Sequence, residues 1–331
     1  MSLAFDPAFA VFAAFLGGFF SLAWLLRLNA RLPLDHPNER SLHTRVTPRI
    51  GGMGMTAGVA LASFVHWSPE LAALLAAALV LALISLLDDY RALPAWGRLL
   101  AHLMVAAGFL AVTLASAFEL GTQGWFALAM LLAITWSTNL YNFMDGADGL
   151  AGGMALFGFA AYAWLAWAGG NLSLAILCGS ISAAALAFLS FNFPPARVFM
   201  GDAGSVPLGF LAAAVGLLGW REGLWHGLVP LLVFSPFIVD ATVTLLRRAF
   251  AGAKVWKAHR SHYYQRLVRM GWSHRRLARA EYVLMAATAL SSVLLVRNME
   301  VKWGILMVWG VFYLVVMMAI DRRWRSAGDE P

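Results

Sequence analysis

A run of amides and carboxylates at residues 139–153 carries the strongest signal for chemistry in the sequence. It reads NLYNFMDGADGLAGG and directly follows a long apolar segment. Asn139, Asn142, Asp145 and Asp148 recur every three residues, so in a helix they would share one face. Such a face at the end of an apolar helix needs a partner, and a metal ion or a phosphate-bearing ligand would serve. A polar loop with Asp-Gly turns is the alternative interpretation.

Two adjacent acids end an earlier apolar segment. Asp88 and Asp89 directly follow the letters LISLL. Adjacent carboxylates on a helix diverge by about 100°, so at most one is expected to bind a given ion directly while the other orients it or contacts a second ligand. A solvated helix end beside Arg91 is the alternative. We favour function, because a helix C-terminus disfavours acids that nothing compensates.

A third polar connection covers residues 191–205, FNFPPARVFMGDAGS. Its two prolines should break a helix, and the glycines around Asp202 should turn the chain into the next one. Backbone amides at such a helix start can hold a diphosphate and its Mg²⁺. A helix start capped by Ser205 or Asp202 fits the same pattern. Phe199 offers a stacking surface for a base, although an interfacial aromatic is often only an anchor.

Basic residues gather in two further loops. The loop at 247–279 is rich in Lys, Arg and His and contains no acid. An anionic-lipid patch explains most of this charge, but not His259 and His262, which flank Arg260 and suit an anion such as phosphate. Arg45 lies in the loop at 27–49, where a contact to a nucleotide or lipid phosphate and topological charge are equally good accounts.

The elements that must position these residues are membrane helices. Hydrophobic residues make up 61% of the 331 and charged residues only 12%, about half the share in a soluble domain. The apolar runs are continuous and about twenty residues long, as a helix needs to cross a bilayer. We therefore predict an all-α, polytopic helical bundle. The eleven predicted spans are 8–26, 50–66, 71–87, 99–117, 125–141, 153–168, 172–191, 206–219, 228–246, 280–296 and 303–320.

Basic residues sort into alternate loops, which predicts the orientation. Of the Lys and Arg residues, only three lie outside the loops that we assign to the cytoplasm: Arg221, Arg297 and Lys302. The positive-inside rule then puts the N-terminus outside, the C-terminus in the cytoplasm and every polar cluster on the cytoplasmic face. The net charge of +7 is thus topological and not a sign of nucleic-acid binding. We expect one transmembrane catalytic domain over 1–321 and a short cytoplasmic tail over 322–331.

Asp240 stands apart, because it lies within the predicted span at 228–246 and about two turns before Arg247. An acid in an apolar span is usually functional or paired with a base. We favour pairing with a base of the following loop, and hence a structural role.

Together, and in order, these clusters resemble the polyprenyl-phosphate N-acetylhexosamine-1-phosphate transferase superfamily, or glycosyltransferase family 4. It includes the enzymes that start O-antigen and enterobacterial common antigen synthesis and the phospho-N-acetylmuramoyl-pentapeptide transferase. The peptidoglycan enzymes have three consecutive histidines where this chain has HRSH, a form similar to O-antigen initiating members. The motifs that carry the resemblance are TPRIGG at 47–52, DD at 88–89, NLYNFMDGADGLA at 139–151, NFPPARVFMGDAGS at 192–205, PFIVD at 236–240 and HRSHYYQRL at 259–267.

The resemblance implies a role for each motif. Asp202 looks like the principal Mg²⁺ ligand, with Asn142 near the metal or its phosphates and Mn²⁺ as a substitute ion. The catalytic residues it implies are Asp88, Asp89, His259 and His262. The candidates for substrate binding are Arg45, Asn142, Asp145, Asp148, Asn192, Phe199 and Arg260.

The implied reaction converts a UDP-N-acetylhexosamine and undecaprenyl phosphate into undecaprenyl-diphospho-sugar and UMP. It would run at the cytoplasmic face of a bacterial inner membrane and start O-antigen or other lipopolysaccharide synthesis, with GlcNAc, FucNAc or QuiNAc as the sugar; a homodimer is compatible with it. A muramoyl-pentapeptide donor and an ion-coupled transporter are the alternatives. A transporter needs polar groups through the depth of the bundle, whereas here they crowd one face.

Overall fold

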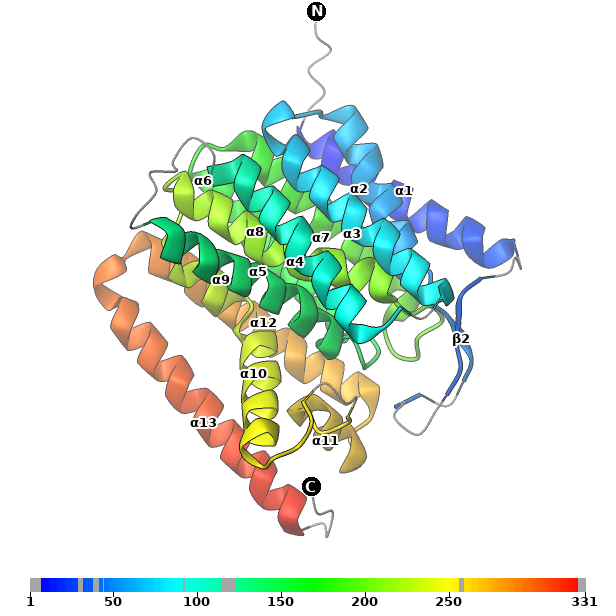
Figure 1. Cartoon of the computed structure of the whole chain (residues 1–331), viewed down its shortest axis with the longest axis vertical. Helices are drawn as coiled ribbons and strands as arrows, with labels where there is room; N and C mark the ends of the chain where they lie inside the picture. The colour runs from blue at the N-terminus through cyan, green and yellow to red at the C-terminus, as the bar shows by residue number, and fades with distance from the viewer. Residues whose placement is uncertain are drawn as a thin grey trace, which may run out of the picture.

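The computed structural model describes residues 7–28, 32–37, 42–43, 45–91, 93–114, 123–255 and 259–326, and there the chain is a bundle of helices (Figure 1). The elements are α1 (Pro7–Arg27), β1 (Leu34–Asp35), β2 (Thr47–Pro48), α2 (Gly51–Val65), η1 (Pro69–Leu71), α3 (Ala72–Arg91), α4 (Ala95–Leu114), α5 (Gln123–Met144), α6 (Leu150–Ala168), α7 (Leu172–Asn192), α8 (Asp202–Arg221), α9 (Leu228–Val233), α10 (Ser235–Phe250), α11 (Tyr263–Arg269), α12 (His274–Arg297), η3 (Met299–Val301) and α13 (Lys302–Ser326).

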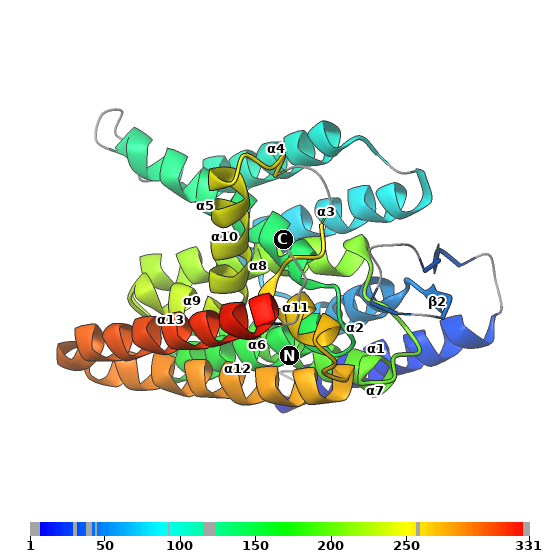
Figure 2. The same cartoon turned by 90° about the horizontal axis from the view of Figure 1, so that it is seen from below.

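Three helices, α6, α7 and α8, form the buried centre of the bundle. α7 packs against α1, α2 and α6, whereas α8 packs against α3 and α5. Figure 2 shows α3, α4 and α5 on one side of α8, and α1, α6, α7 and α12 on the other. Small residues allow this close packing: a Cβ on Gly209 of α8 would lie 2.5 Å from the carbonyl oxygen of Ser137 on α5.

Each of the eleven predicted spans contains a helix, which confirms the class of polytopic helical membrane protein. Within the described residues, eight helices are long and apolar enough to cross a bilayer, and α2 is a shorter apolar helix. The count of eleven crossings and the orientation of the termini stay predictions. α13 continues to Ser326, so the first residues of the predicted tail are helical, and residues 327–331 lie outside the described ranges.

The predicted span at 228–246 is two helices rather than one. α9 ends at Val233, and α10 starts at Ser235 after a break at Phe234. The cause is Pro236, which has no backbone N–H to donate and restricts the residue before it. The Ser235 hydroxyl donates to the Leu232 carbonyl at 2.7 Å across this break. α10 therefore turns away from α9, as both views show (Figures 1 and 2).

The predicted loop at 88–98 is mostly helical. α3 continues to Arg91, and α4 already starts at Ala95. Pro94 explains the early start, because its ring fixes φ for the helix and its carbonyl accepts from Gly97 and Arg98. Both acids of the DD pair and Arg98 consequently lie on rigid helix ends.

The prediction that four polar residues of 139–148 share one helical face is only half right. α5 ends at Met144, so Asn139 and Asn142 are helical, whereas Asp145 and Asp148 lie in the loop to α6. The loop ends at Gly149, the N-cap of α6, which adopts φ +79° in the left-handed region.

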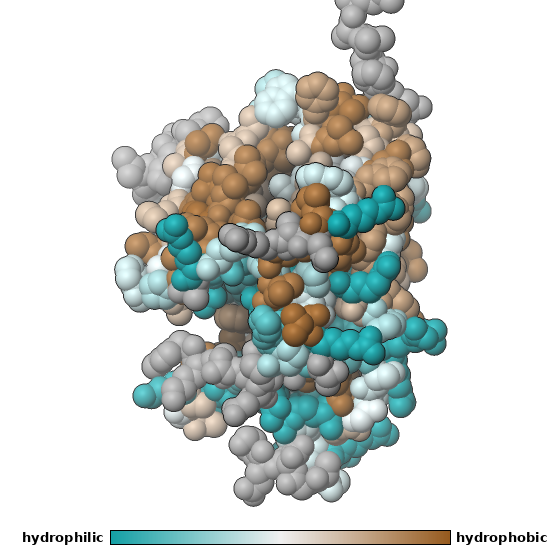
Figure 3. All heavy atoms as spheres, turned by 90° about the vertical axis from the view of Figure 1, so that its right-hand side faces the viewer, coloured by the Kyte–Doolittle hydropathy of each residue, from teal (hydrophilic) through white to brown (hydrophobic). Residues whose placement is uncertain are grey.

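A short antiparallel hairpin, β1 with β2, stands beside the loop before α8. Leu34 pairs with Pro48, and Arg49 forms a parallel bridge to Phe199. Figure 3 views the molecule from the side on which Figure 1 shows β2: apolar side chains cover its upper part and hydrophilic ones gather in its lower part. Polar side chains are thus collected toward one end of this face.

Candidate active site

A small polar cavity of about 100 Å³ lies where the ends of α5 and α7 meet the start of α8. Six of the predicted site residues line it, so the helix ends bring together motifs that are far apart in the sequence. These six are Asn142, Asp145, Asp148, Asn192, Phe199 and Asp202. The other lining side chains come from the hairpin region and the start of α12: Asp35, His43, Arg49 and His274.

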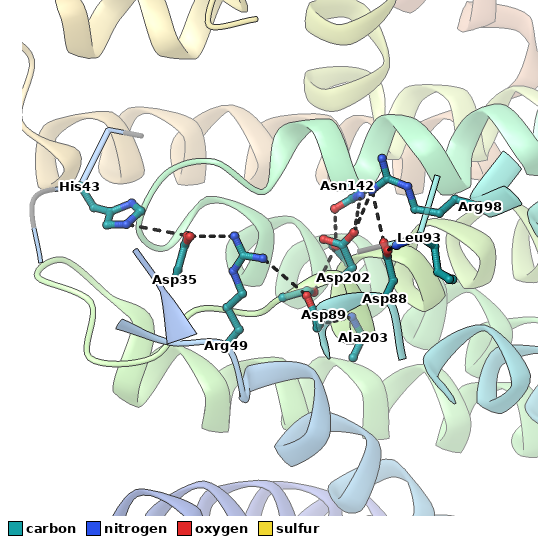
Figure 4. Close-up of polar contacts among 12 residues, drawn as sticks. Asp35, His43, Arg49, Asp88, Asp89, Leu93, Arg98, Asn142, Asp202 and Ala203 are labelled. Atoms are coloured by element: carbon teal, nitrogen blue, oxygen red, sulfur yellow. Dashed lines mark hydrogen bonds and ion pairs between the residues drawn. The ribbon is translucent and has the colours of Figure 1, made fainter. Parts of the chain in front are cut away.

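Asp202 lies at the centre of the polar contacts (Figure 4). It is the first residue of α8, where Gly201 occupies the N-cap without a side-chain capping bond, so the alternative of a cap by Asp202 or Ser205 is wrong. The Asn142 Nδ2 donates to Asp202 Oδ2 at 3.3 Å. The Ser205 hydroxyl donates to Asn142 Oδ1 at 2.9 Å. Ser205 therefore orients the amide that faces the carboxylate of Asp202.

Asp88 and Asp89 point in different directions, as their positions on a helix predict. Asp88 accepts from the backbone N–H of Leu93 at 2.5 Å, and its side chain is 8% exposed. Asp89 accepts from the backbone N–H of Ala203 at 3.4 Å, and its side chain is 1% exposed. Asp88 thus faces the α3–α4 turn and Asp89 the first turn of α8. The alternative of a solvated pair beside Arg91 is wrong.

Arg98 is a site residue that we did not predict. Its Nη1 lies 3.3 Å from Asp88 Oδ2 and 3.5 Å from Asp202 Oδ2, so one guanidinium bridges the two carboxylates (Figure 4). A base in the first turn of the helix that follows an acidic pair could have indicated Arg98. This signal depends on recognising that Pro94 starts that helix.

Arg49 provides the second cation. Its Nη2 donates to Asp35 Oδ1 at 2.7 Å, and its Nη1 lies 3.6 Å from Asp89 Oδ1. Burial alone would lower the pKa of Arg49, but the nearby charge and hydrogen bond of Asp35 raise it. The guanidinium therefore stays charged, between an acid of the hairpin and the buried Asp89.

His43, Phe199 and Arg45 lie at the outer side of the cavity. The ring centroids of His43 and Phe199 are 4.7 Å apart, edge to face. Arg45 is exposed and lines an adjacent, wider cavity of about 560 Å³ that shares His43 and Phe199 with the first. Arg45 is therefore placed to reach a ligand that extends outward from Phe199, and in the part of the chain that the structure describes no ion pair joins it to the acids.

Asp145 is an acid with an unusual proton affinity. Burial and the charge of Asp202 raise its pKa to about 7. Two carboxylates in one cavity resist simultaneous ionisation unless a cation joins them. Asp145 and Asp202 together thus favour the binding of a cation.

Asp148 and Asn192 connect the loops that surround the cavity. Asp148 accepts from the Ala196 backbone N–H at 3.0 Å and lies 3.2 Å from His274 Nδ1. Burial opposes ionisation of Asp148, yet these hydrogen bonds outweigh it and lower its pKa. Asn192 accepts from the Gly149 N–H and donates to the Val198 carbonyl, both at 2.8 Å. Both side chains are already hydrogen-bonded to the protein, so they position the cavity wall.

The histidine segment, residues 259–267, is held by Asp240. Its carboxylate accepts from the backbone N–H groups of Tyr263 at 2.9 Å and Tyr264 at 3.0 Å, and lies 3.3 Å from His262 Nδ1. His262 is thus the base of this loop that lies beside Asp240, although the closest partners of the carboxylate are the two backbone N–H groups. Tyr264 in turn donates its hydroxyl to the Phe143 carbonyl at 3.2 Å. This bond ties the segment to the end of α5.

His259 and His262 pack against each other, with ring centroids 4.9 Å apart. Burial and the neighbouring His262 lower the pKa of His259 to about 4, so it is neutral near pH 7. Arg260 beside them is exposed. Among the described residues, no hydrogen bond or ion pair joins either histidine to the acids at 88, 89 or 202. The structure therefore connects the histidine segment to the acids through Tyr264 and α5.

The donor set around Asp202 suits a hard cation such as Mg²⁺, which prefers carboxylate and amide oxygens. Over the described ranges, no group of three or more His, Cys, Asp and Glu side chains is arranged to hold a metal. Asp202 and Asn142 would supply only part of the coordination. Mg²⁺ is commonly held in this way, by one or two carboxylates and the phosphates of a substrate.

Comparison with known proteins places this arrangement in a family. The family model for glycosyl transferase family 4 matches residues 71–219, from the start of α3 to the last turn of α8. A probable undecaprenyl-phosphate N-acetylglucosaminyl 1-phosphate transferase of Bacillus subtilis (strain 168) is 31% identical over 301 residues, covering 87% of this chain and 83% of the relative.

Two further relatives agree. An undecaprenyl-phosphate alpha-N-acetylglucosaminyl 1-phosphate transferase of Escherichia coli O157:H7 is 28% identical over 89% of this chain and 85% of its own length. A phospho-N-acetylmuramoyl-pentapeptide-transferase of Shouchella clausii (strain KSM-K16) is 31% identical over 70% of this chain and 78% of its own length. The chain therefore belongs to the polyprenyl-phosphate N-acetylhexosamine-1-phosphate transferase superfamily, glycosyl transferase family 4.

Proposed function

We propose that the protein transfers an N-acetylhexosamine-1-phosphate from a UDP-sugar to undecaprenyl phosphate at the cytoplasmic face of a bacterial inner membrane. The products are UMP and the undecaprenyl-diphospho-sugar that starts O-antigen or related surface polysaccharide synthesis. The names of the relatives support the acceptor lipid and the transferred group. The HRSH form of the histidine motif supports an N-acetylhexosamine donor over a muramoyl-pentapeptide donor.

The observation that carries this proposal is the set of contacts around Asp202. Arg98 links Asp88 to Asp202, and the Asn142 amide also donates to Asp202. Next to them, Arg49 links Asp89 to Asp35. Both reactants are anions, so a diphosphate and a lipid phosphate meet only where cations offset their repulsion. When a ligand binds, the bases of such a site can leave the acids and pair with the phosphates of the ligand.

The bond changes in the proposed reaction need little proton transfer. An oxygen of the lipid phosphate forms a bond to the sugar-bearing phosphorus, and the bond from that phosphorus to the bridging oxygen breaks, so UMP leaves with the electron pair. A phosphate monoester has a second pKa near ~6, so the acceptor is largely dianionic at neutral pH. Asp88 and Asp89 then have three candidate tasks: to position the metal, to accept a residual proton, or to form a covalent intermediate in a two-step transfer.

Mg²⁺ is the cofactor that we propose, held by Asp202 and Asn142, with Mn²⁺ as a substitute. When bound, it would neutralise charge on the phosphates as the leaving oxygen takes up its electrons. Ser205 keeps the Asn142 amide oriented, and Asn142 faces Asp202. Arg98 has to share or give up its contact with Asp202, because both cations need the same carboxylate.

Phe199 and the wider cavity beside it are the proposed place for the nucleoside. Phe199 presents a half-buried ring at the border of both cavities. Uracil can stack on such a ring, with its diphosphate toward Asp202. His259, Arg260 and His262 would approach the acceptor phosphate from the histidine segment, His259 as a neutral hydrogen-bond partner rather than a fixed cation.

The direct test supplies purified protein with Mg²⁺, undecaprenyl phosphate and radiolabelled UDP-GlcNAc, UDP-FucNAc, UDP-QuiNAc or UDP-MurNAc-pentapeptide. We expect stoichiometric UMP and labelled lipid with at least one of the three N-acetylhexosamines, and no product after chelation by EDTA. Transfer from the muramoyl-pentapeptide donor alone would overturn the proposed donor class. Absence of any lipid product, with ion flux across proteoliposomes, would overturn the transferase in favour of a transporter.

A further inference from the structure

His274 is the first residue of α12, and it lies on the border between the two polar cavities of the candidate active site. His43, Asp148 and Phe199 share this position, because they also line both cavities. The His274 side chain is 18% exposed, so the cavity wall encloses most of it. A ligand that extends from one cavity into the other therefore passes beside this imidazole.

The imidazole of His274 is paired with Asp148. Its Nδ1 lies 3.2 Å from Asp148 Oδ1, while Asp148 Oδ2 accepts from the Ala196 backbone N–H at 3.0 Å. The backbone nitrogen of Asp148 also lies 3.2 Å from the same Nδ1. One ring nitrogen cannot donate and accept at once, and a carboxylate at this distance favours the protonated ring. His274 is therefore an imidazolium that neutralises Asp148.

The smaller cavity contains more acids than its charge balance with an anionic ligand allows, unless cations compensate them. The acids that line it are Asp35, Asp145, Asp148 and Asp202. The two arginines described above compensate Asp35 and Asp202. For Asp148 the paired cation is His274. Without this imidazolium, a diphosphate would meet a bare carboxylate in a partly buried site, where water screens repulsion weakly.

The start of α12 is fixed by bonds that do not involve the imidazole. Ser273 caps the helix by accepting from the Arg276 backbone N–H at 3.2 Å. Arg275 Nη2 donates to the Pro194 carbonyl at 3.0 Å. One to two turns farther along, the hydroxyl of Tyr282 donates to a backbone carbonyl of the α5–α6 loop at 2.9 Å. The helix start should therefore stay in place when the imidazole is replaced.

We propose that His274 sets the affinity of this site for the uridine diphosphate part of the donor, by neutralising Asp148 and fixing its carboxylate. The inference rests on the proposed function and adds a residue that controls donor binding. His274 acts through Asp148, so it is a positioning residue and takes no part in the bond changes. It should therefore affect nucleotide affinity and leave turnover and the lipid acceptor alone.

The first test measures UDP binding to purified protein by isothermal titration calorimetry, with Mg²⁺ and without lipid. His274→Gln keeps a polar side chain but cannot carry the charge, so we expect the Kd for UDP to rise about tenfold. Arg276→Gln is the matched control, because this guanidinium lies 4.1 Å from the ring centroid of Trp272 and lines neither cavity. Its Kd should stay within about twofold of wild type. An unchanged Kd in His274→Gln, or an equal rise in both variants, would overturn the proposal.

A double-mutant cycle with Asp148→Asn tests whether His274 acts through the carboxylate. When residue 148 is uncharged, His274→Gln should change the Kd for UDP by less than about twofold, because no charge remains to be neutralised. A loss as large as in the wild-type background would mean that His274 contacts the nucleotide directly, and the positioning role would be rejected.

Turnover distinguishes this inference from the proposed reaction. With labelled UDP-sugar and undecaprenyl phosphate, His274→Gln should raise the KM for the UDP-sugar about tenfold and leave kcat and the KM for the lipid within about twofold. A fall in kcat at unchanged donor KM would reject the inference while the transferase stands. UDP binding that depends on His274, without any transfer by wild type, would retain the nucleotide site and reject the proposed reaction.

A measurement on the unaltered protein covers the case in which a variant fails to fold. Diethyl pyrocarbonate modifies accessible histidines, and mass spectrometry quantifies each modified peptide with and without UDP. Saturating UDP should slow the modification of His274 by about threefold or more, because a bound nucleotide covers the cavity wall. His226, exposed between α8 and α9, is the internal control and should react at the same rate in both samples. Equal modification of His274 with and without UDP would show that the nucleotide does not occupy this border, and the proposal would fail.

Discussion

Asp202 and Asp240 are both carboxylates on helices next to polar loops, yet their partners differ in kind. Asp240 accepts from two backbone N–H groups at 2.9 and 3.0 Å and from the Thr244 hydroxyl at 3.1 Å, with His262 at 3.3 Å. Within the described residues, the side-chain partners of Asp202 are Asn142 at 3.3 Å and Arg98 at 3.5 Å. Backbone donors are fixed by the fold, whereas long side chains can move away.

The difference indicates what each carboxylate is for. Asp240 is almost fully hydrogen-bonded by the protein itself, so it stabilises the histidine segment and has little capacity left for a ligand. Asp202 is compensated loosely, by groups that a cation can replace and that a phosphate can draw away. An acid with exchangeable partners in a cavity is typical of a binding site, and an acid with backbone partners in an apolar span is typical of a structural one.

The largest predicted effect separates these two roles directly. Asp202→Asn keeps the size of the side chain but removes the charge that attracts the metal, so transfer should fall by about a thousandfold or more while the protein stays folded. Transfer of labelled sugar and thermal melting in detergent measure the two properties. Asp321→Asn, which weakens ion pairs to Arg247 and Arg266, is the control and should retain most activity. Full activity of Asp202→Asn would remove the metal assignment.

Asp240→Ala should give the second largest effect, and mainly through stability. It leaves the N–H groups of Tyr263 and Tyr264 without their acceptor, at about 1–3 kcal/mol for each buried donor. We expect a lower melting temperature, faster proteolysis near residues 251–262 and a loss of transfer that follows the loss of structure. Thr244→Ala removes one hydrogen bond to the same carboxylate and keeps the backbone bonds, so it should be milder. Equal stability of both variants would contradict the structural role.

A smaller effect is predicted at Ser205, which acts on Asp202 through Asn142. Ser205→Ala removes the hydroxyl that holds Asn142 Oδ1 at 2.9 Å and leaves the amide free to rotate. The Mg²⁺ concentration for half-maximal transfer should rise by about tenfold, with a smaller change in kcat. Ser137→Ala is the matched control, because its hydroxyl donates to the Gly209 carbonyl across the same α5–α8 interface. Identical Mg²⁺ dependence in both variants would argue against an orienting role.

Much of the fold and of the acidic site could be predicted from the sequence. Apolar runs located the helices, and the divergence of Asp88 and Asp89 followed from the helical period. Asp145 and Asp148 were predicted to share a site with Asp202, and they line one cavity with it. The predicted helical face was partly wrong, because the helix ends at Met144 and both acids lie in the loop beyond it.

The missed features depend on contacts that no local pattern encodes. Arg98 became a site residue because Pro94 starts α4 early and because α3 and α8 bring Asp88 and Asp202 to the same guanidinium. The bonds of Asn192 to two backbone groups arise between loops that are distant in the sequence. The break at Phe234 required weighing Pro236 against an otherwise continuous apolar run.

The smallest predicted effect concerns pH: the acidic site and the histidine segment should change the stability of the protein in opposite directions as the pH rises. Burial and the charge of Asp202 raise the pKa of Asp145 from 3.8 to about 7. The folded protein therefore binds this proton more tightly than the unfolded chain. The proton's contribution to folding stability is fully present below pH 3.8 and is lost as the pH rises through 7. His259 has the opposite sign: its pKa falls from 6.5 to about 4, so its contribution is lost below pH 4 and is complete above 6.5.

In metal-free protein these two contributions oppose each other over nearly the same pH range, and single substitutions should separate them. Relative to wild type, Asp145→Asn should make the melting temperature rise more steeply between pH 4 and 6.5, because only the His259 contribution remains. His259→Gln should do the reverse, since the Asp145 contribution then acts alone. Melting curves at several pH values measure both slopes. If melting temperature depends on pH in the same way in all three proteins, neither Asp145 nor His259 has the perturbed pKa. If both substitutions change the slope in the same direction, the acids and the histidine segment do not differ as their surroundings indicate.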